Sequence, residues 1–191
     1  MKPCNVFYLI FLYSLVSCKS VKVNSHSFIE NKRTLYFPKK VDIVKKTPKH
    51  SNVWVFILAG QSNMAGRGFV EPQDTVPTER LLTVSANGQL VLAKEPLHFY
   101  EPKLTGLDCG LSFGKTLVKN IPDSISILLI PTAVGGSSIS QWLGDSLLSN
   151  IQLLSNFRQK VQIGNRYGQV KAILWHQGEA DAKLNYITGY K

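Results

Sequence analysis

The sequence predicts an α/β fold built on a mainly parallel sheet, and two observations carry that prediction. Three mainly apolar runs, at residues 53–59, 125–130 and 170–174, are rich in β-branched and large aliphatic residues. The first run, which is unbroken, is typical of a strand buried on both faces, as in a parallel sheet, and the other two are also strand-like. Helical apolar patterns separate the runs, and strands that alternate with helices favour this architecture.

Two segments have the apolar spacing of helices. Residues 111–119 form the shorter one, and residues 145–161 form the longer one, with Asp145 or Ser146 as its N-cap. The apolar stripe of the longer helix comprises Leu147, Leu148, Ile151, Leu154 and Phe157. Between residues 81 and 93, Asn87-Gly88 predicts a β-hairpin with a type I′ turn. We interpret this hairpin as a surface insertion.

Each of the three predicted strands ends in a loop of glycine and polar residues. Ser62 follows the first strand in a Gly-Gln-Ser-Asn sequence, at the expected start of a helix whose amide donors favour negative charge. The alternative is a simple turn in which the serine or asparagine caps that helix. Because ligands bind beyond the carboxyl ends of parallel strands, three such loops in order favour a functional site.

These loops carry a resemblance to a known family. Gly-Gln-Ser-Asn-Met at 60–64, the Gly-Gly-Ser-Ser segment at 135–138 and His-Gln-Gly-Glu at 176–179 resemble blocks I to III of the SGNH (GDSL-like) hydrolases, of the sialate O-acetylesterase and carbohydrate esterase family 6 type. The resemblance implies a flavodoxin-like three-layer α/β/α sandwich and cofactor-free removal of O-acetyl groups from sialate- or xylan-type carbohydrates. It implies Ser62 as nucleophile, Gly135 or Gly136 as a backbone oxyanion donor, and Gln177 as a side-chain donor.

Ester cleavage explains these residue types. The tetrahedral intermediate carries an oxyanion, and loss of one preorganised donor typically costs about 2.7–4 kcal/mol. Serine needs a neighbouring base, and the resemblance implies a final Asp-x-x-His block. No histidine follows His176, so we expect a domain that is incomplete at its C-terminus. His176 is the alternative base, but neighbours on a strand point to opposite sides, so His176 and Gln177 should not both face the site. We expect His98 in a surface stretch and His176 packed beneath the third loop.

Four further residues are candidates for a role in the site. Arg67 either orients a polar substrate group or pairs with a local carboxylate. Glu179, with Asp181 beside it, either lies in the pocket or caps a following helix. Trp142 either forms a stacking wall for a sugar or packs in the core.

The N-terminus predicts export. Residues 1–17 resemble a lipoprotein signal peptide whose apolar stretch is too short for a permanent membrane span, and Leu-Val-Ser-Cys at 15–18 places Cys18 as the lipidated residue. An ordinary cleaved signal is the alternative. We expect residues 18–52 to form a basic tether and residues 53–191 the esterase domain, held at the periplasmic or cell surface. Cys109 would remain alone, as a small buried residue.

The net charge of +10 does not indicate nucleic-acid binding. Residues 19–52 carry nine lysines and arginines against two acidic residues, whereas residues 53–191 carry twelve basic and ten acidic residues. The excess therefore belongs to the tether, which is either disordered in solvent or close to an anionic membrane. No cysteine and histidine spacing predicts a metal site. The alternative function is a non-catalytic carbohydrate-binding lipoprotein or an inactive fragment, favoured by the missing histidine.

Overall fold

The computed structural model describes residues 33–182, so the predicted signal peptide and Cys18 lie outside the described residues. A five-stranded sheet has the order β3-β2-β4-β1-β7, in which all neighbours are parallel except the antiparallel pair β2 and β3. Its strands are β1 (Val53–Gly60), β2 (Leu81–Val84), β3 (Leu90–Leu92), β4 (Ser126–Pro131) and β7 (Gln169–His176). The helices are η1 (His50–Asn52), α2 (Ser62–Ala65), η2 (Pro72–Thr75), α3 (Gly110–Leu117), α4 (Ile139–Leu143) and α5 (Leu153–Tyr167).

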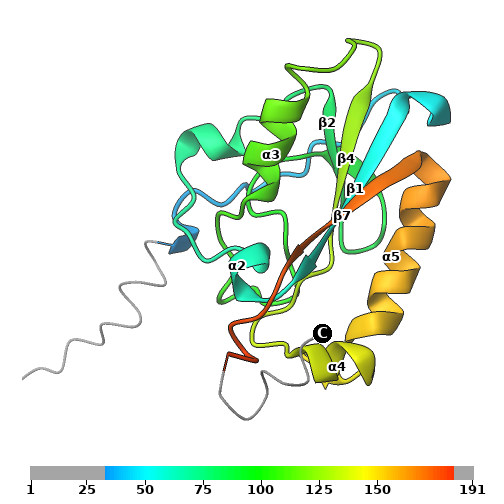
Figure 1. Cartoon of the computed structure of the whole chain (residues 1–191). Coiled ribbons are helices and arrows are strands. Elements are labelled where there is room, and N and C mark those ends of the chain that lie inside the picture. The colour runs from blue at the N-terminus through cyan, green and yellow to red at the C-terminus, as the bar shows by residue number, and fades with distance from the viewer. Residues whose placement is uncertain (1–32, 183–191) are drawn as a thin grey trace, which may run out of the picture.

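Helices cover both faces of this sheet, which confirms the predicted α/β fold (Figure 1). Alternate residues of β1 point to opposite faces. Phe56 and Leu58 pack in the core beneath α3, whereas Val55 and Ile57 pack in the core beneath α5. Burial of each large aliphatic side chain contributes roughly 1.5–3 kcal/mol, so both layers depend on the unbroken apolar run of β1.

The longer helix begins later than predicted. Residues 147–152 form a two-stranded ribbon, β5 (Leu147–Leu148) and β6 (Ile151–Gln152), and α5 starts at Leu153 rather than at Asp145. Ser149 and Asn150 between these strands have φ values of 50° and 62°, which a helix cannot contain. The N-cap residue is therefore Gln152 and not Asp145 or Ser146. Asp145 still contacts the first turn of the helix, because its carboxylate accepts hydrogen bonds from the backbone N–H and the hydroxyl of Ser155.

The predicted hairpin exists, but it is part of the main sheet and not a surface insertion. β2 pairs with β4 and its four residues are all buried. The turn also differs from type I′, because Asn87 does not have positive φ. Gly88 does (φ 79°), and its N–H donates to Ser85 O at 2.9 Å. This is the hairpin in which a left-handed glycine follows the turn.

Part of the predicted tether packs on this hairpin. Ile43 forms an antiparallel bridge with Val91, and the N–H of Leu92 donates to Asp42 O at 2.8 Å. Lys94 Nζ lies 2.6 Å from the Asp42 carboxylate. Residues 37–43 are therefore ordered against the sheet by a main-chain pairing and an ion pair. Their lysine-rich composition had instead predicted a tether.

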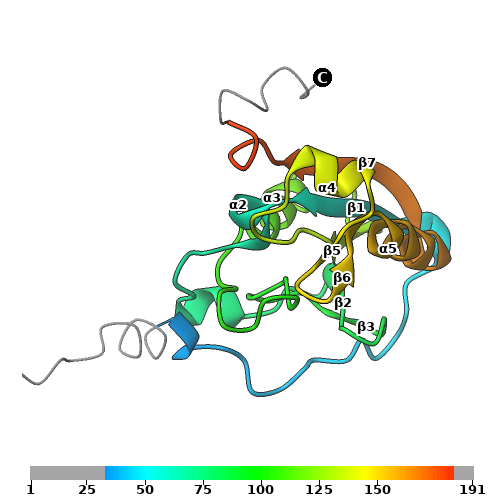
Figure 2. The same ribbon diagram turned by 90° about the horizontal axis from the view of Figure 1, so that it is seen from below.

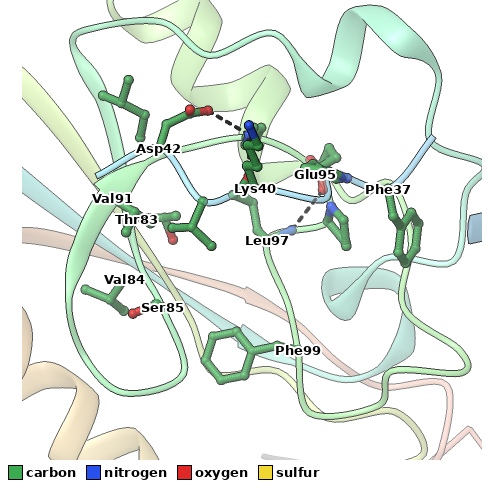
Figure 3. A pocket seen from close by; sticks show the side chains of 15 residues that line it. Phe37, Lys40, Asp42, Thr83, Val84, Ser85, Val91, Glu95, Leu97 and Phe99 are labelled. Atoms are coloured by element: carbon green, nitrogen blue, oxygen red, sulfur yellow. Dashed lines mark hydrogen bonds and ion pairs between the residues drawn. The ribbon is translucent and has the colours of Figure 1, made fainter. Parts of the chain in front are cut away.

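A hollow lies between residues 37–42, the hairpin and the segment 94–99 (Figure 3). Its walls include Phe37, Val84, Val91, Leu97 and Phe99. Glu95 is fully buried at this hollow, with one carboxylate oxygen accepting the N–H of Leu97 at 3.1 Å (Figure 3). Burial, reinforced by the charge of Asp108, raises the pKa of Glu95 well above its ordinary value.

We expect the Glu95→Gln variant to gain stability relative to the wild type as the pH rises. A carboxyl with a raised folded-state pKa must keep its proton on folding, so above the unfolded-state pKa the wild type loses up to about 1.4 kcal/mol per pH unit, until the folded-state pKa is passed. Glutamine removes this cost. Urea unfolding of both proteins between pH 5 and 8 measures the difference. Glu79→Gln, at an exposed position, is the control, and a pH-independent difference at Glu95 would contradict the assignment.

Two residues lie where the sequence did not predict them. His98 is 2% exposed rather than on the surface, and its Nδ1 lies 2.8 Å from Asp108 Oδ2. Cys109 is exposed rather than buried, with Sγ 3.7 Å from Met64 Sδ. Desolvation, and then the charge of Asp108, raises the pKa of the Cys109 thiol. The carboxylate of Asp108 provides one of the two buried imidazole nitrogens of His98 with a partner inside the protein.

Candidate active site

Three loops meet at the carboxyl edge of the sheet. They are the first loop (residues 60–68, after β1), the second loop (residues 132–138, after β4) and the third loop (residues 177–181, after β7). The helices α2 and α4 begin at this edge, and Figure 2 shows both beside the end of β7. The strands hold the loops in register, because Gln61 N–H donates to His176 O at 2.9 Å and Val134 N–H donates to Gly60 O at 3.1 Å.

Gly60 is required where the first loop leaves β1. Its φ is 134°, outside the range of residues with a side chain, and a Cβ there would lie 2.0 Å from His176 O. The glycine thus lets β1 and β7 stay paired up to the residue before Gln61. This close approach fixes the start of α2, and therefore the position of Ser62.

Two side chains tie the loops together: Gln61, which sequence reasoning did not assign to the site, and Asp181, which it placed either in the pocket or at a helix cap. The buried Gln61 accepts the N–H of Ala180 at 3.1 Å and that of Gly178 at 3.4 Å through Oε1. The buried Asp181 accepts the N–H of Ile139 at 2.9 Å and a hydrogen from Gln177 Nε2. Gln61 belongs to the Gly-Gln-Ser-Asn-Met motif, but nothing in that motif indicated that its side chain binds the third loop.

Ser62 is the first residue of α2 and is half-buried, with Gln61 at the N-cap position. Its hydroxyl makes no hydrogen bond to any other residue in the range 33–182. The serine is thus presented at the edge of the sheet, beside the free amides of a helix start, where developing negative charge is favoured. Within this range no imidazole lies within hydrogen-bonding distance of it.

The second loop brings its two glycines to different surroundings. Gly135 is half-buried, and its N–H donates to Glu101 Oε2 at 2.7 Å. Gly136 is exposed, has φ 73°, and has open space where a Cβ would be. No hydrogen bond from the Gly136 N–H to another residue of the described range is present. The sequence left open whether Gly135 or Gly136 has an N–H available to an oxyanion. Because the Gly135 N–H already binds Glu101, the N–H of Gly136 is the available one.

Gln177 is 8% exposed and lies inside the loop cluster. Its Nε2 donates to Ser137 O at 3.1 Å, to Gln61 Oε1 at 3.3 Å and to Asp181. His176 has the opposite orientation, with 53% of its side chain exposed, so it is not packed beneath the third loop as predicted. The geometric argument that these neighbours point to opposite sides is therefore confirmed.

The remaining candidates have internal partners. Arg67 forms a 2.8 Å ion pair with Glu101. Glu179 accepts a hydrogen bond from Asn63 Nδ2 and lies 3.6 Å from His176 Nε2. Trp142 is 4% exposed and donates from Nε1 to Ser137 Oγ at 2.9 Å, in the arrangement that the packing interpretation expects. A contact between Trp142 and a sugar would require this side chain to be uncovered.

Within residues 33–182 no cluster of three histidine, cysteine or carboxylate side chains has the arrangement of a metal site. In the same range no helix is both long and apolar enough to cross a bilayer.

Comparison with known proteins identifies relatives of this chain. The family described as "Carbohydrate esterase, sialic acid-specific acetylesterase" has a model that matches residues 52–191. Among curated proteins, the chain is 34% identical over 144 residues to the probable carbohydrate esterase At4g34215 of Arabidopsis thaliana, covering 66% of this chain and 54% of that protein. The chain thus spans about half the length of this curated relative.

Solved structures share the fold. The structure of the Arabidopsis thaliana protein AT4G34215 has a TM-score of 0.58 at 32% identity, and the match covers 67% of this chain and 58% of that one. NanS has a TM-score of 0.53 at 19% identity, over 74% of this chain and 58% of its own, a likeness that bears on the fold alone.

Proposed function

Because the chain belongs to the carbohydrate esterase, sialic acid-specific acetylesterase family, we propose that the protein is a serine esterase that removes O-acetyl groups from carbohydrates. The observation that carries this proposal is the position of Ser62. It starts α2 at the carboxyl edge of the sheet, where the second and third loops also begin. A hydroxyl in this place, next to the first backbone amides of α2, suits attack on an ester carbonyl.

In the proposed reaction, Ser62 Oγ attacks the acetyl carbonyl carbon and transfers its proton to a base. The oxyanion receives hydrogen bonds from Ser62 N–H, a second-loop glycine N–H and Gln177. Collapse of the intermediate expels the sugar hydroxyl, which takes up the proton, and water then releases acetate from Ser62. The base expected from the family resemblance is a histidine of an Asp-x-x-His pair. Gln177 can donate to the oxyanion only if its amide gives up one of its internal acceptors.

The test is acetate release by the full-length protein from acetylated sialic acid, acetylated xylan oligosaccharides and p-nitrophenyl acetate. We expect turnover of at least one of the two sugar classes, and the preferred class assigns the substrate. Where Ser62 is replaced by alanine, a Ser112→Ala variant, at an exposed position on α3, is the control for nonspecific effects of serine replacement. Absence of acetate release from all three substrates would contradict an esterase.

A second candidate is a carbohydrate-binding lipoprotein without catalysis. It is supported by the Ser62 hydroxyl, which has no imidazole partner within residues 33–182, and by His176, whose Nε2 faces Glu179. Isothermal titration with the same acetylated sugars separates the two candidates. Binding without acetate release supports the second one, whereas turnover excludes it.

We propose that the protein is exported and held at a membrane through lipid on Cys18, in the sequence Leu-Val-Ser-Cys. Several acyl chains hold a protein firmly, whereas one chain alone binds marginally. The Cys18→Ala variant should therefore move from the membrane fraction to the soluble fraction, or remain unprocessed. Fractionation followed by mass spectrometry of the N-terminus measures both outcomes, and a wild-type protein found wholly in the soluble fraction would contradict the anchor.

A further inference from the structure

Glu101 connects two of the three loops that form the candidate site. Its side chain is 11% exposed, and Oε2 accepts both the N–H of Gly135 at 2.7 Å and a hydrogen from Arg67 Nη2 at 2.8 Å. Arg67 belongs to the first loop and Gly135 to the second. One carboxylate oxygen therefore fixes the distance between the loop that presents Ser62 and the loop that presents Gly136.

Arg67 is itself held in place by the first loop. Its Nη1 donates to Gly66 O at 2.9 Å, so the guanidinium lies against its own backbone while Nη2 reaches the carboxylate. Charge-assisted hydrogen bonds of this kind are about twice as strong as neutral ones, and a partly enclosed pair is screened less by solvent than an exposed one. The pair therefore forms a fixed acceptor for the second loop.

The absence of a side chain at Gly135 makes this contact possible. A Cβ there would lie 2.1 Å from Arg67 Nη2 and 2.8 Å from both oxygens of Glu101. At Gly136, in contrast, nothing lies within 4 Å of a Cβ. The two glycines thus serve different purposes: the first allows the ion pair to reach the backbone, and the second leaves the adjacent peptide open.

We propose that Glu101 is a positioning residue of the esterase site, which engages the amide of Gly135 and so holds the second loop with the amide of Gly136 directed at the oxyanion. The inference rests on the proposed function. It makes Gly136 the second-loop donor, and it makes Arg67 a support for Glu101 rather than a contact of the substrate. Positioning matters because a donor displaced by about 1 Å can cost 10²-fold in rate.

The first test compares Glu101→Gln and Glu101→Ala in the full-length protein. Glutamine can still accept the Gly135 N–H but loses the charge that holds Arg67, so we expect kcat to fall by about 10-fold, and by about 100-fold with alanine. KM should change little, because the oxyanion forms only in the transition state. Glu79→Gln, which changes the same charge at an exposed position, is the matched control.

The second test is a double-mutant cycle with Arg67→Ala. If Arg67 acts through Glu101, the loss in kcat for Arg67→Ala should be largely absent in the Glu101→Ala background. If Arg67 instead contacts the substrate, its loss appears in KM and adds to that of Glu101→Ala, which overturns its assigned role. A thermal melt of each variant confirms that the comparison is between folded proteins, and the glutamine variant preserves the test should alanine prevent folding.

Failure of this inference differs from failure of the proposed function. A wild type that releases no acetate contradicts the esterase itself. An active wild type whose folded Glu101→Gln and Glu101→Ala variants retain the full kcat contradicts only the positioning role. The labelling rate of Ser62 by a fluorophosphonate gives a second readout, because its phosphoryl oxygen occupies the oxyanion site; it should fall in parallel with kcat.

Discussion

Replacement of Ser62 by alanine in the full-length protein should lower kcat for acetate release by about 10⁴- to 10⁶-fold. Without the hydroxyl no acyl-enzyme forms, and only binding and oxyanion stabilisation remain. The fold should survive, because Ser62 is half-buried and its hydroxyl holds no other described residue. Acetate release from the preferred sugar ester, measured beside a thermal melt, tests both statements.

Two comparisons sharpen this experiment. Ser112→Ala should retain full turnover, because that serine is exposed on α3. His176→Ala should also retain most of it, because the imidazole lies on the exposed side of β7 with Glu179, and not on the side of Gln177. Robust turnover by Ser62→Ala would remove the nucleophile from this position, whereas a large loss in His176→Ala would make that histidine the base.

The Gly60→Ala variant should be destabilised by more than about 3 kcal/mol, and is expected to leave little folded protein. Two costs combine here. An alanine at φ 134° is strained, and its Cβ would lie 2.0 Å from His176 O, which is part of the backbone of the neighbouring strand. Relief of that clash requires β1 and β7 to separate at the edge where Ser62 is presented.

Gly88→Ala is the matched control, because it has positive φ (79°) without the clash, the nearest atom being Ile163 Cδ1 at 3.5 Å. It should cost only about 1 kcal/mol, the strain of a left-handed alanine. Urea unfolding of both variants measures the contrast. Equal stabilities for the two variants would show that the approach of β7 to Gly60 does not limit this position.

Local patterns were sufficient for most of the sheet. The strands at 53–60, 126–131 and 169–176 were each predicted to within about two residues. β1 and β4 are almost fully buried, and a strand buried on both faces produces a nearly continuous apolar run. β7 was also found from its apolar residues, although it lies at the edge of the sheet and none of its residues is fully buried. The start of the helix predicted at 145–161 was wrong for a local reason as well. The leucines at 147 and 148 have helical spacing with the later apolar residues, yet Ser149 and Asn150 adopt positive φ and turn the chain into a ribbon.

Some residues of the candidate site were likewise predicted from local patterns, and others were not. The motif identified Ser62, the two second-loop glycines and Gln177, because these residue types follow directly after strands that the sequence reveals. It did not identify Glu101 or the buried pair of His98 and Asp108, since all three lie in a segment without periodicity. Their contacts join residues that are ten or more positions apart in the sequence, and a local pattern cannot reveal such contacts.

The sequence by itself determined three features: the α/β class, the loops that follow the strands β1, β4 and β7, and the position of Ser62 in the first of these loops. These follow from hydrophobic periodicity and turn chemistry, which act over a few neighbouring residues. Only the tertiary structure decided which glycine amide is open, which carboxylate holds Arg67, and which side of β7 carries His176. The physical reason is that a hydrogen bond between loops is fixed by where the strands place their ends, and that placement depends on the packing of the whole sheet.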